Sequence, residues 1–287
     1  LLAKLGRRDE AIEAFRRLWA IKPNDGSVGN NLGVLLGESG RFDEAVDVLR
    51  KSVRLAPSDP KALYNLGNAL VQTGEVDQAA NAYRELLKIQ PDNPEGHCNL
   101  GQVLRSQGRY VEALTELKRG DELGSKRPGW PYPSGRWVQQ VQPLADLEAE
   151  AEKWLGDPQR WNELDPTRLA ALARIARNRE AWWTAARLSN RALDQGGPSD
   201  ADARVQAAAA AVQAATRAEG DSAKLDDAER ARLLGQAQSR LREVLQVLER
   251  SPSPRSAASR RLLDRWLADP HLQPTRAPAA IEKLSEP

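Results

Sequence analysis

The sequence predicts an all-α protein whose first half is a solenoid of repeated helix pairs. Its residues 60–93 recur at a constant offset of 34 residues, both upstream and downstream. Within this unit, apolar residues follow helical spacing in two successive runs. Glycine and proline then mark where each run must end. The offset aligns Gly6, Gly40, Gly74 and Gly108; Ala11, Ala45, Ala79 and Ala113; Phe15, Leu49, Tyr83 and Leu117; and Pro23, Pro57 and Pro91.

The unit formed by residues 60–93 predicts a helix, a turn and a second helix. Gly74 allows the first helix to stop, and Pro91 cannot continue the second. Small residues at Gly67 and Ala79 should let the two helices approach closely. The larger side chains that should fill the seam between them are Leu66, Tyr83 and Leu86. Stacked neighbouring pairs would bury the face that one pair leaves open.

These residues resemble the tetratricopeptide repeat (TPR) family, which has Leu-Gly in the first helix, then Ala, an aromatic residue or Leu, and a closing Pro. The resemblance covers residues 1–125: half a unit, complete units at 26–59 and 60–93, and a fourth from residue 94 without the closing proline. The position that is usually Trp holds Gly29, Leu63 and His97. The resemblance implies a right-handed superhelix of about three and a half repeats over residues 1–123, with a concave groove.

Composition narrows the class of protein. The 287 residues are 40% hydrophobic and 29% charged, with a net charge of +2. We therefore expect no nucleic-acid partner and, without a long apolar run, no membrane insertion. The lone Cys98 excludes an internal disulfide framework and suits a cytoplasmic location. The chain lacks methionine and begins within a helical pattern, so we expect a fragment preceded by further repeat or another domain.

The residues predict no enzyme, metal or cofactor site. His97 and Cys98 are neighbours within a repeat helix, where core or groove lining explains both. The other histidine, His271, lies far away in the tail. Acid pairs such as Asp43-Glu44 lie at helix starts, where the helix dipole accounts for them.

The segment 124–137, which we call the joint, separates the repeats from a second helical region. It combines three prolines with Trp130, Tyr132 and Trp137. We expect these aromatic rings to lie across the last repeat and cover its apolar edge. The alternative is a proline-rich ligand for an adaptor domain.

Residues 138–287 predict a degenerate TPR-like helical module with an irregular tail. Helices are expected at 138–155, at 166–175 after an Asp165 N-cap, at 179–193, at 201–218 and from Asp226 onward, then at 256–267 with a last turn near Ile281. Of the adjacent Trp182 and Trp183, one should fill core and the other a seam or the surface. The stripe that follows Asp226 fits packing on the 201–218 helix or a coiled-coil dimer; it comprises Leu234, Ala237, Leu241, Val244 and Leu248.

Two segments resemble a second family. The stretches LGSKRPGWPYPSGRWV and AKLDDAERARL are similar to a module that follows TPR repeats in large bacterial serine/threonine protein kinases. The resemblance implies that a kinase domain could precede this chain. These residues contain no kinase glycine-rich loop, HRD or DFG motif.

The candidate site is the concave groove. Asn31, Asn65 and Asn99 recur at the 34-residue offset, one position before each Leu-Gly pair, so they can face the concave side. Such a ladder could hold a peptide backbone, and it resembles the asparagine ladder of the O-linked N-acetylglucosamine transferases. Bonding between adjacent repeats is the alternative. The predicted groove residues are Asn30, Asn31, Tyr64, Asn65, Asn68, Gln72, Asn99, Gln102 and Arg105.

Three functions remain open from the sequence. The first is a scaffold that binds an extended peptide or partner protein in the groove. The second is a regulatory tail of a kinase, and the third is a homo-oligomerising assembly module. A clamp for acidic chaperone tails is not expected, because Asn30, Asn68, Glu95 and Asn99 occupy the groove helices among Lys61 and Arg105.

Overall fold

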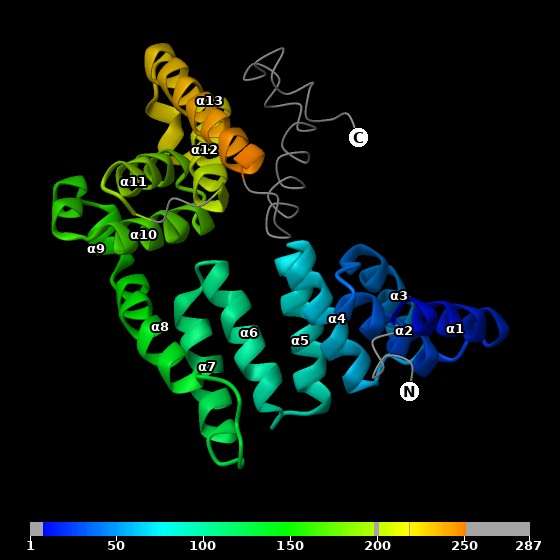
Figure 1. Ribbon diagram of the computed structural model, residues 1–287. Coiled ribbons are helices and arrows are strands. Elements are labelled where there is room, and N and C mark those ends of the chain that lie inside the picture. Colours follow the sequence, from blue (N-terminus) through cyan, green and yellow to red (C-terminus); the bar gives the residue numbers. More distant parts are fainter. Residues whose placement is uncertain (1–7, 198–200, 218, 251–287) are drawn as a thin grey trace. The chain divides into compact units, whose positions relative to one another are not determined.

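A computed structural model describes residues 8–197, 201–217 and 219–250, and every element in these ranges is helical (Figure 1). The all-α prediction is therefore confirmed. The chain divides into two compact units, Leu1–Ala145 and Asp146–Pro287. The helix predicted at 256–267, the tail and the turn near Ile281 lie outside the described residues.

The first unit consists of a single helix, three stacked antiparallel helix pairs and most of an eighth helix (Figure 1). One helix precedes three complete pairs, as the repeat pattern predicts. The bounds are α1 Arg8–Ile21, α2 Gly26–Glu38, α3 Phe42–Leu55, α4 Pro60–Thr73, α5 Val76–Ile89, α6 Pro94–Ser106, α7 Tyr110–Gly124 and α8 Ser134–Ala149.

The ends of these helices follow from residues that recur with the repeat. Asp25, Asp59 and Asn93 precede α2, α4 and α6, and each side chain accepts a hydrogen bond from a backbone N–H in the first turn. At the other end, Gly40, Gly74 and Gly108 have φ between 75° and 78°. This left-handed conformation favours glycine, so the turn between paired helices is fixed by the sequence.

The glycine of each Leu-Gly pair sets the distance between the two helices of a repeat. A Cβ added to Gly33 would lie 2.4 Å from Leu49 Cγ, and one added to Gly67 would lie 2.5 Å from Tyr83 Cε1. Gly101 has the same relation to Leu117, at 2.6 Å. The expectation that small residues permit close approach while large ones fill the seam is confirmed.

The helix after the joint differs from its prediction. It was expected at 138–155, but α8 begins at Ser134, directly after Pro133, whose carbonyl accepts a hydrogen bond from the Trp137 N–H. It ends at Ala149, and α9 (Ala151–Leu155) follows a break at Glu150. The Lys153 N–H bonds to the Glu150 carbonyl three residues back, so the chain tightens there and the helix is interrupted.

The joint and α8 continue the 34-residue pattern of the repeats. Pro128 follows Pro60 and Pro94 at the same offset, and Gly135 follows Gly101. Residues 128–133 replace the first turns of a helix because prolines interrupt them and Gly129 has a φ of 71°. We therefore describe α8 as a further first helix of a repeat, with its beginning unwound.

The second unit contains two helix pairs, α10 with α11 and α12 with α13, with one 3₁₀ turn before the first pair and one inside the second. A 3₁₀ turn, η2, was not anticipated; it buries Trp161, whose Nε1 donates to the Trp154 carbonyl. The Asp165 N-cap is confirmed by bonds from the Thr167 and Arg168 N–H groups. The elements after α9 are η2 Pro158–Glu163, α10 Pro166–Asn178, α11 Trp182–Asp194, α12 Ala201–Thr216, η3 Gly220–Lys224 and α13 Asp227–Arg250.

Helix α13 packs against α12, as the intramolecular reading of its apolar stripe predicts. Ala237, Leu241 and Val244 are buried, and Arg204 of α12 pairs with Glu243 of α13. The expected start is also present, since the Glu229 N–H bonds to the Asp226 carboxylate. The side chain of Leu248 lies outside the description.

The prediction for the adjacent tryptophans was wrong in part. Neither Trp182 nor Trp183 is fully buried. Instead, the guanidinium of Arg217 lies over Trp182, and that of Arg187 lies over Trp183. Arginine stacking shields each indole face, so neither ring needs a place in the core.

Two glycines of α2 provide a test of this packing. Gly33→Ala forces a Cβ into Leu49 and should lower the free energy of unfolding by about 1–3 kcal/mol. Gly37→Ala meets nothing within 4 Å and should raise it, by up to about 1 kcal/mol. Urea unfolding of both variants measures the contrast. Equal effects at the two positions would show that the contact does not set the helix spacing.

Candidate functional site

Amide side chains of successive first helices bond to one another. The Asn65 Nδ2 donates to Asn30 Oδ1 at 2.8 Å, and the Asn99 Nδ2 donates to Asn68 Oδ1 at 3.2 Å. Asn31 is exposed instead. The row of Asn31, Asn65 and Asn99 is thus not a set of three equivalent amides, and the inter-repeat bonding that the sequence left open is present at two of them.

A buried tyrosine fixes the orientation of Asn68. The Tyr83 hydroxyl donates to Asn68 Oδ1 at 2.7 Å, and its ring meets that of Tyr64 edge to face. Burial raises the pKa of Tyr83 well above its ordinary value, so the hydroxyl stays protonated. Because Asn68 Oδ1 accepts two hydrogen bonds, its Nδ2 is left as a donor.

A cavity of about 490 Å³ lies between α2 and α4, over residues of α3. It brings together three predicted groove residues: Asn65, Asn68 and Gln72. Among its lining residues, Glu38 is the one with a charged side chain. The remaining lining residues are Gly33, Val34, Gly37, Phe42, Leu49 and Ala69.

Two of the other predicted groove residues, Tyr64 and Arg105, contact later segments of the chain itself. The Tyr64 hydroxyl bonds to the Tyr132 hydroxyl of the joint, and Arg105 reaches Gln140 of α8. Gln102 has a buried Nε2 without a hydrogen-bond partner in the described ranges. Asn30 is buried and bonded to Asn65. The predicted groove therefore separates into the α2–α4 cavity and an α4–α6 section beside the joint. The sequence offered no local signal for this division.

His97 bonds to other residues of the repeats, and Cys98 is buried among them. His97 Nδ1 lies 2.6 Å from Glu116 Oε2 of α7, and its Nε2 lies 2.8 Å from the Pro91 carbonyl oxygen. Cys98 is fully buried, which raises the pKa of its thiol to about 12, so it is not a thiolate at neutral pH. Over the described residues, no cluster of three His, Cys, Asp or Glu side chains could hold a metal ion, and no helix could span a bilayer.

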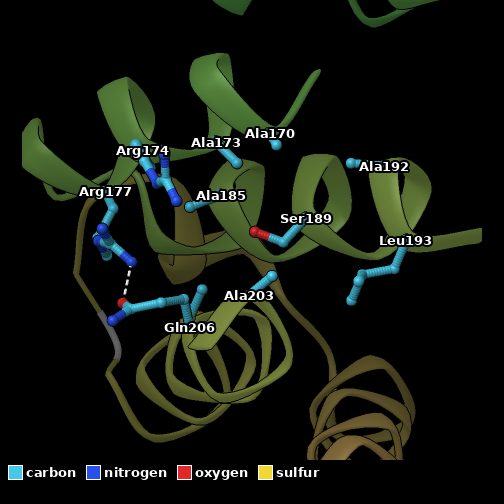
Figure 2. A pocket seen from close by; sticks show the side chains of 11 residues that line it. Ala170, Ala173, Arg174, Arg177, Ala185, Ser189, Ala192, Leu193, Ala203 and Gln206 are labelled. Carbon is cyan, nitrogen blue, oxygen red and sulfur yellow. Dashed lines mark hydrogen bonds between the residues drawn. The ribbon is translucent and has the colours of Figure 1, made fainter. Parts of the chain in front are cut away.

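The second unit has a small pocket between α10, α11 and α12 (Figure 2). Figure 2 shows Arg177 bonded to Gln206, with Arg174 and Ser189 nearby and alanines around them. Its volume of about 30 Å³ suits one or two water molecules and not a peptide. The sequence did not predict this pocket.

Comparison with known proteins identifies the repeats. The TPR repeat family matches residues 35–74 and 67–108, so this region consists of TPR repeats. A solved structure of MamA, MSR-1, is 26% identical, with 44% of this chain and 72% of that chain covered and a TM-score of 0.41.

Two further solved structures give similar values. Another MamA structure is 22% identical over 53% of this chain and 87% of that chain, with a TM-score of 0.43. The first TPR of Spaghetti (RPAP3), bound to the HSP90 peptide SRMEEVD, is 18% identical over 42% and 94%, with a TM-score of 0.39. No curated protein matches the chain.

The amide bond between α2 and α4 predicts a coupled effect on stability. Asn65→Ala and Asn30→Ala should each be destabilising, and the double variant should cost less than their sum by about 0.5–1.5 kcal/mol. Asn31→Ala, at an exposed position, is the matched control and should change stability little. Chemical denaturation of the four variants tests this, and strict additivity would rule out a stabilising bond.

His97 predicts a pH dependence of stability. Burial alone would lower the pKa of His97, but its hydrogen bonds with Glu116 and the Pro91 carbonyl raise it above the ordinary value. A raised folded pKa gives stabilisation that is complete below about pH 6.5 and is lost as pH rises through the folded pKa. The melting temperature of the wild type should therefore exceed that of His97→Gln by less as pH increases from 5.5 to 8.5.

His271 is common to both proteins in this comparison, so its titration cancels in the difference. A difference in melting temperature that stayed constant across this range would mean that His97 does not gain a proton on folding.

Proposed function

We propose that the first unit is a protein-interaction scaffold that binds an extended peptide of a partner protein in the α2–α4 cavity. The TPR repeats support the general class. The proposal of this particular site rests on one observation, which is the cavity lined by three amides. The kinase-tail and homo-oligomer alternatives stay predictions.

The bonds between repeats prepare the amides for a peptide. Asn65 uses its Nδ2 to bond Asn30, which leaves its Oδ1 as an acceptor. Asn68 uses its Oδ1 twice, which leaves its Nδ2 as a donor. An acceptor and a donor side by side match the N–H and C=O of a peptide backbone. Since neighbouring bonds already orient both amides, little side-chain entropy is lost on binding.

The shape of the cavity suits a short extended segment. Gly37 has no side chain and a Cβ added there would meet nothing within 4 Å, so a ligand backbone can come close to α2 at this position. Packed helices are about 8–10 Å apart, so the width of two helices together is about 16–20 Å. Extended chain rises about 3.3 Å per residue, so about five or six residues of a ligand cross both helices. The Glu38 carboxylate lies 4.0 Å from the Arg8 guanidinium, and its negative charge at the cavity favours a cationic side chain in the ligand over an acidic one.

Blocking the cavity with one side chain tests the proposal. Peptides are first selected against the wild-type protein from a random 12-residue display library. Gly37→Trp adds a large ring where a Cβ meets nothing within 4 Å, so the fold should persist while the cavity fills. We expect calorimetry to show at least a tenfold rise in Kd for the selected peptides.

The control is Gly235→Trp on α13, which adds the same ring at another position without neighbours within 4 Å. It should leave the affinity unchanged. For the wild-type protein, replacing a lysine or arginine of a selected peptide by glutamate should weaken the binding of that peptide. If Gly37→Trp bound the peptides as tightly as the control does, the cavity would not be the binding site.

A further inference from the structure

The joint reaches back over two repeats. Its Tyr132 hydroxyl lies 3.1 Å from the hydroxyl of Tyr64 on α4, 68 positions earlier in the chain. Arg127 pairs with Glu95 at the start of α6. Trp130 packs on Gly124 at the end of α7, where an added Cβ would lie 2.3 Å from the indole. The joint therefore touches three helices of the repeat array and not just the last one.

Its aromatic rings form one cluster. Trp130 and Tyr132 stack with ring centroids 4.9 Å apart, and Trp137 meets Tyr132 edge to face at 5.6 Å. The Trp130 Nε1 donates to Ser134 Oγ, which donates to the Asp121 carboxylate at 2.6 Å. Burial raises the pKa of Tyr132 above its ordinary value, so its hydroxyl remains neutral beside Tyr64. Helix α7 thus anchors Trp130, while Tyr132 extends to α4.

The joint contacts the repeats in the way that a bound peptide would. An irregular, proline-rich segment lies against first helices of the repeats and presents an aromatic residue and a basic residue to them. Proline restricts the unbound conformations of such a segment, so docking it costs little entropy. Tyr64, a predicted groove residue, meets this segment in place of an external ligand.

We propose that the α4–α6 section, with Tyr64 and Glu95, is a second binding surface for extended segments that alternate proline and aromatic residues. The joint is its resident occupant, and a partner segment of that chemistry competes with it. Because the joint is tethered, its effective concentration is about millimolar, so the wild type admits an external segment weakly. The proposal does not depend on peptide binding in the α2–α4 cavity.

The experiment supplies the chain's own segment as a separate peptide. The probe is a fluorescein-labelled synthetic peptide with the sequence of residues 126–137, and anisotropy measures its binding. In the protein, Trp130→Ala with Tyr132→Ala removes the two stacked rings of the occupant. We expect this double variant to bind the probe at least tenfold more tightly than the wild type. A further Tyr64→Ala should abolish that gain.

Several controls make the result specific. A probe with alanine at the positions of Trp130 and Tyr132 should not bind. Trp183→Ala removes a half-buried indole from the second unit and should leave the wild-type affinity unchanged. Gly37→Trp should also have no effect on the probe, which separates this surface from the α2–α4 cavity.

Tyr132→Phe provides a milder variant in case the double variant loses its fold. It removes the hydroxyl that meets Tyr64 and keeps the ring, and it should raise the affinity for the probe by a few fold. Equal weak binding by the wild type and the folded variants would overturn the proposal. Binding that survived Tyr64→Ala would also overturn it, since the probe would then lie elsewhere.

Discussion

The distance between paired helices in the first unit depends on one contact. In each repeat, a large side chain of the second helix packs against the glycine of the Leu-Gly pair in the first helix. Leu49, Tyr83 and Leu117 fill this place in turn, opposite Gly33, Gly67 and Gly101. The contact brings the backbones of paired helices close together. It also fixes which side of each first helix is buried in the pair, because side chains one position away are turned by about 100°. The amides one position before each Leu-Gly pair, Asn31, Asn65 and Asn99, are consequently turned away from the seam and are exposed or half-buried.

This constraint explains how much of the site could be predicted. Residue spacing predicted which side of each first helix faces the groove, and three of the predicted residues, Asn65, Asn68 and Gln72, line one cavity. It could not identify which amides bond across repeats. Asn65 pairs with Asn30, 35 positions earlier, whereas Asn99 pairs with Asn68, 31 positions earlier. That choice depends on the stagger between neighbouring helices, which a strict 34-residue offset does not contain.

The joint shows a different limit of prediction. Its continuation of the repeat was visible in Pro60, Pro94 and Pro128, but the proline-rich composition of 128–133 indicated a connector. Local patterns also located the helices of the second unit, where caps and breaks are strong, while missing the break at Glu150 and the turn η2. The contact of Tyr132 with Tyr64 follows from small rotations added over successive repeats. Such a sum cannot be read from neighbouring residues.

In this chain, one segment therefore both closes the end of the repeat array and shapes its groove. The joint covers part of the last pair through Trp130 on Gly124, and the same short segment places Tyr132 against α4. What remains open on α2 and α4 is lined by amides and a single carboxylate, while the section near the joint is aromatic. Asn68 lies at the border, since its oxygen serves Tyr83 and Asn99 and its nitrogen is left as a donor. Two surfaces of different chemistry thus adjoin along one row of helices, and the residues that stabilise the array also determine where each surface ends.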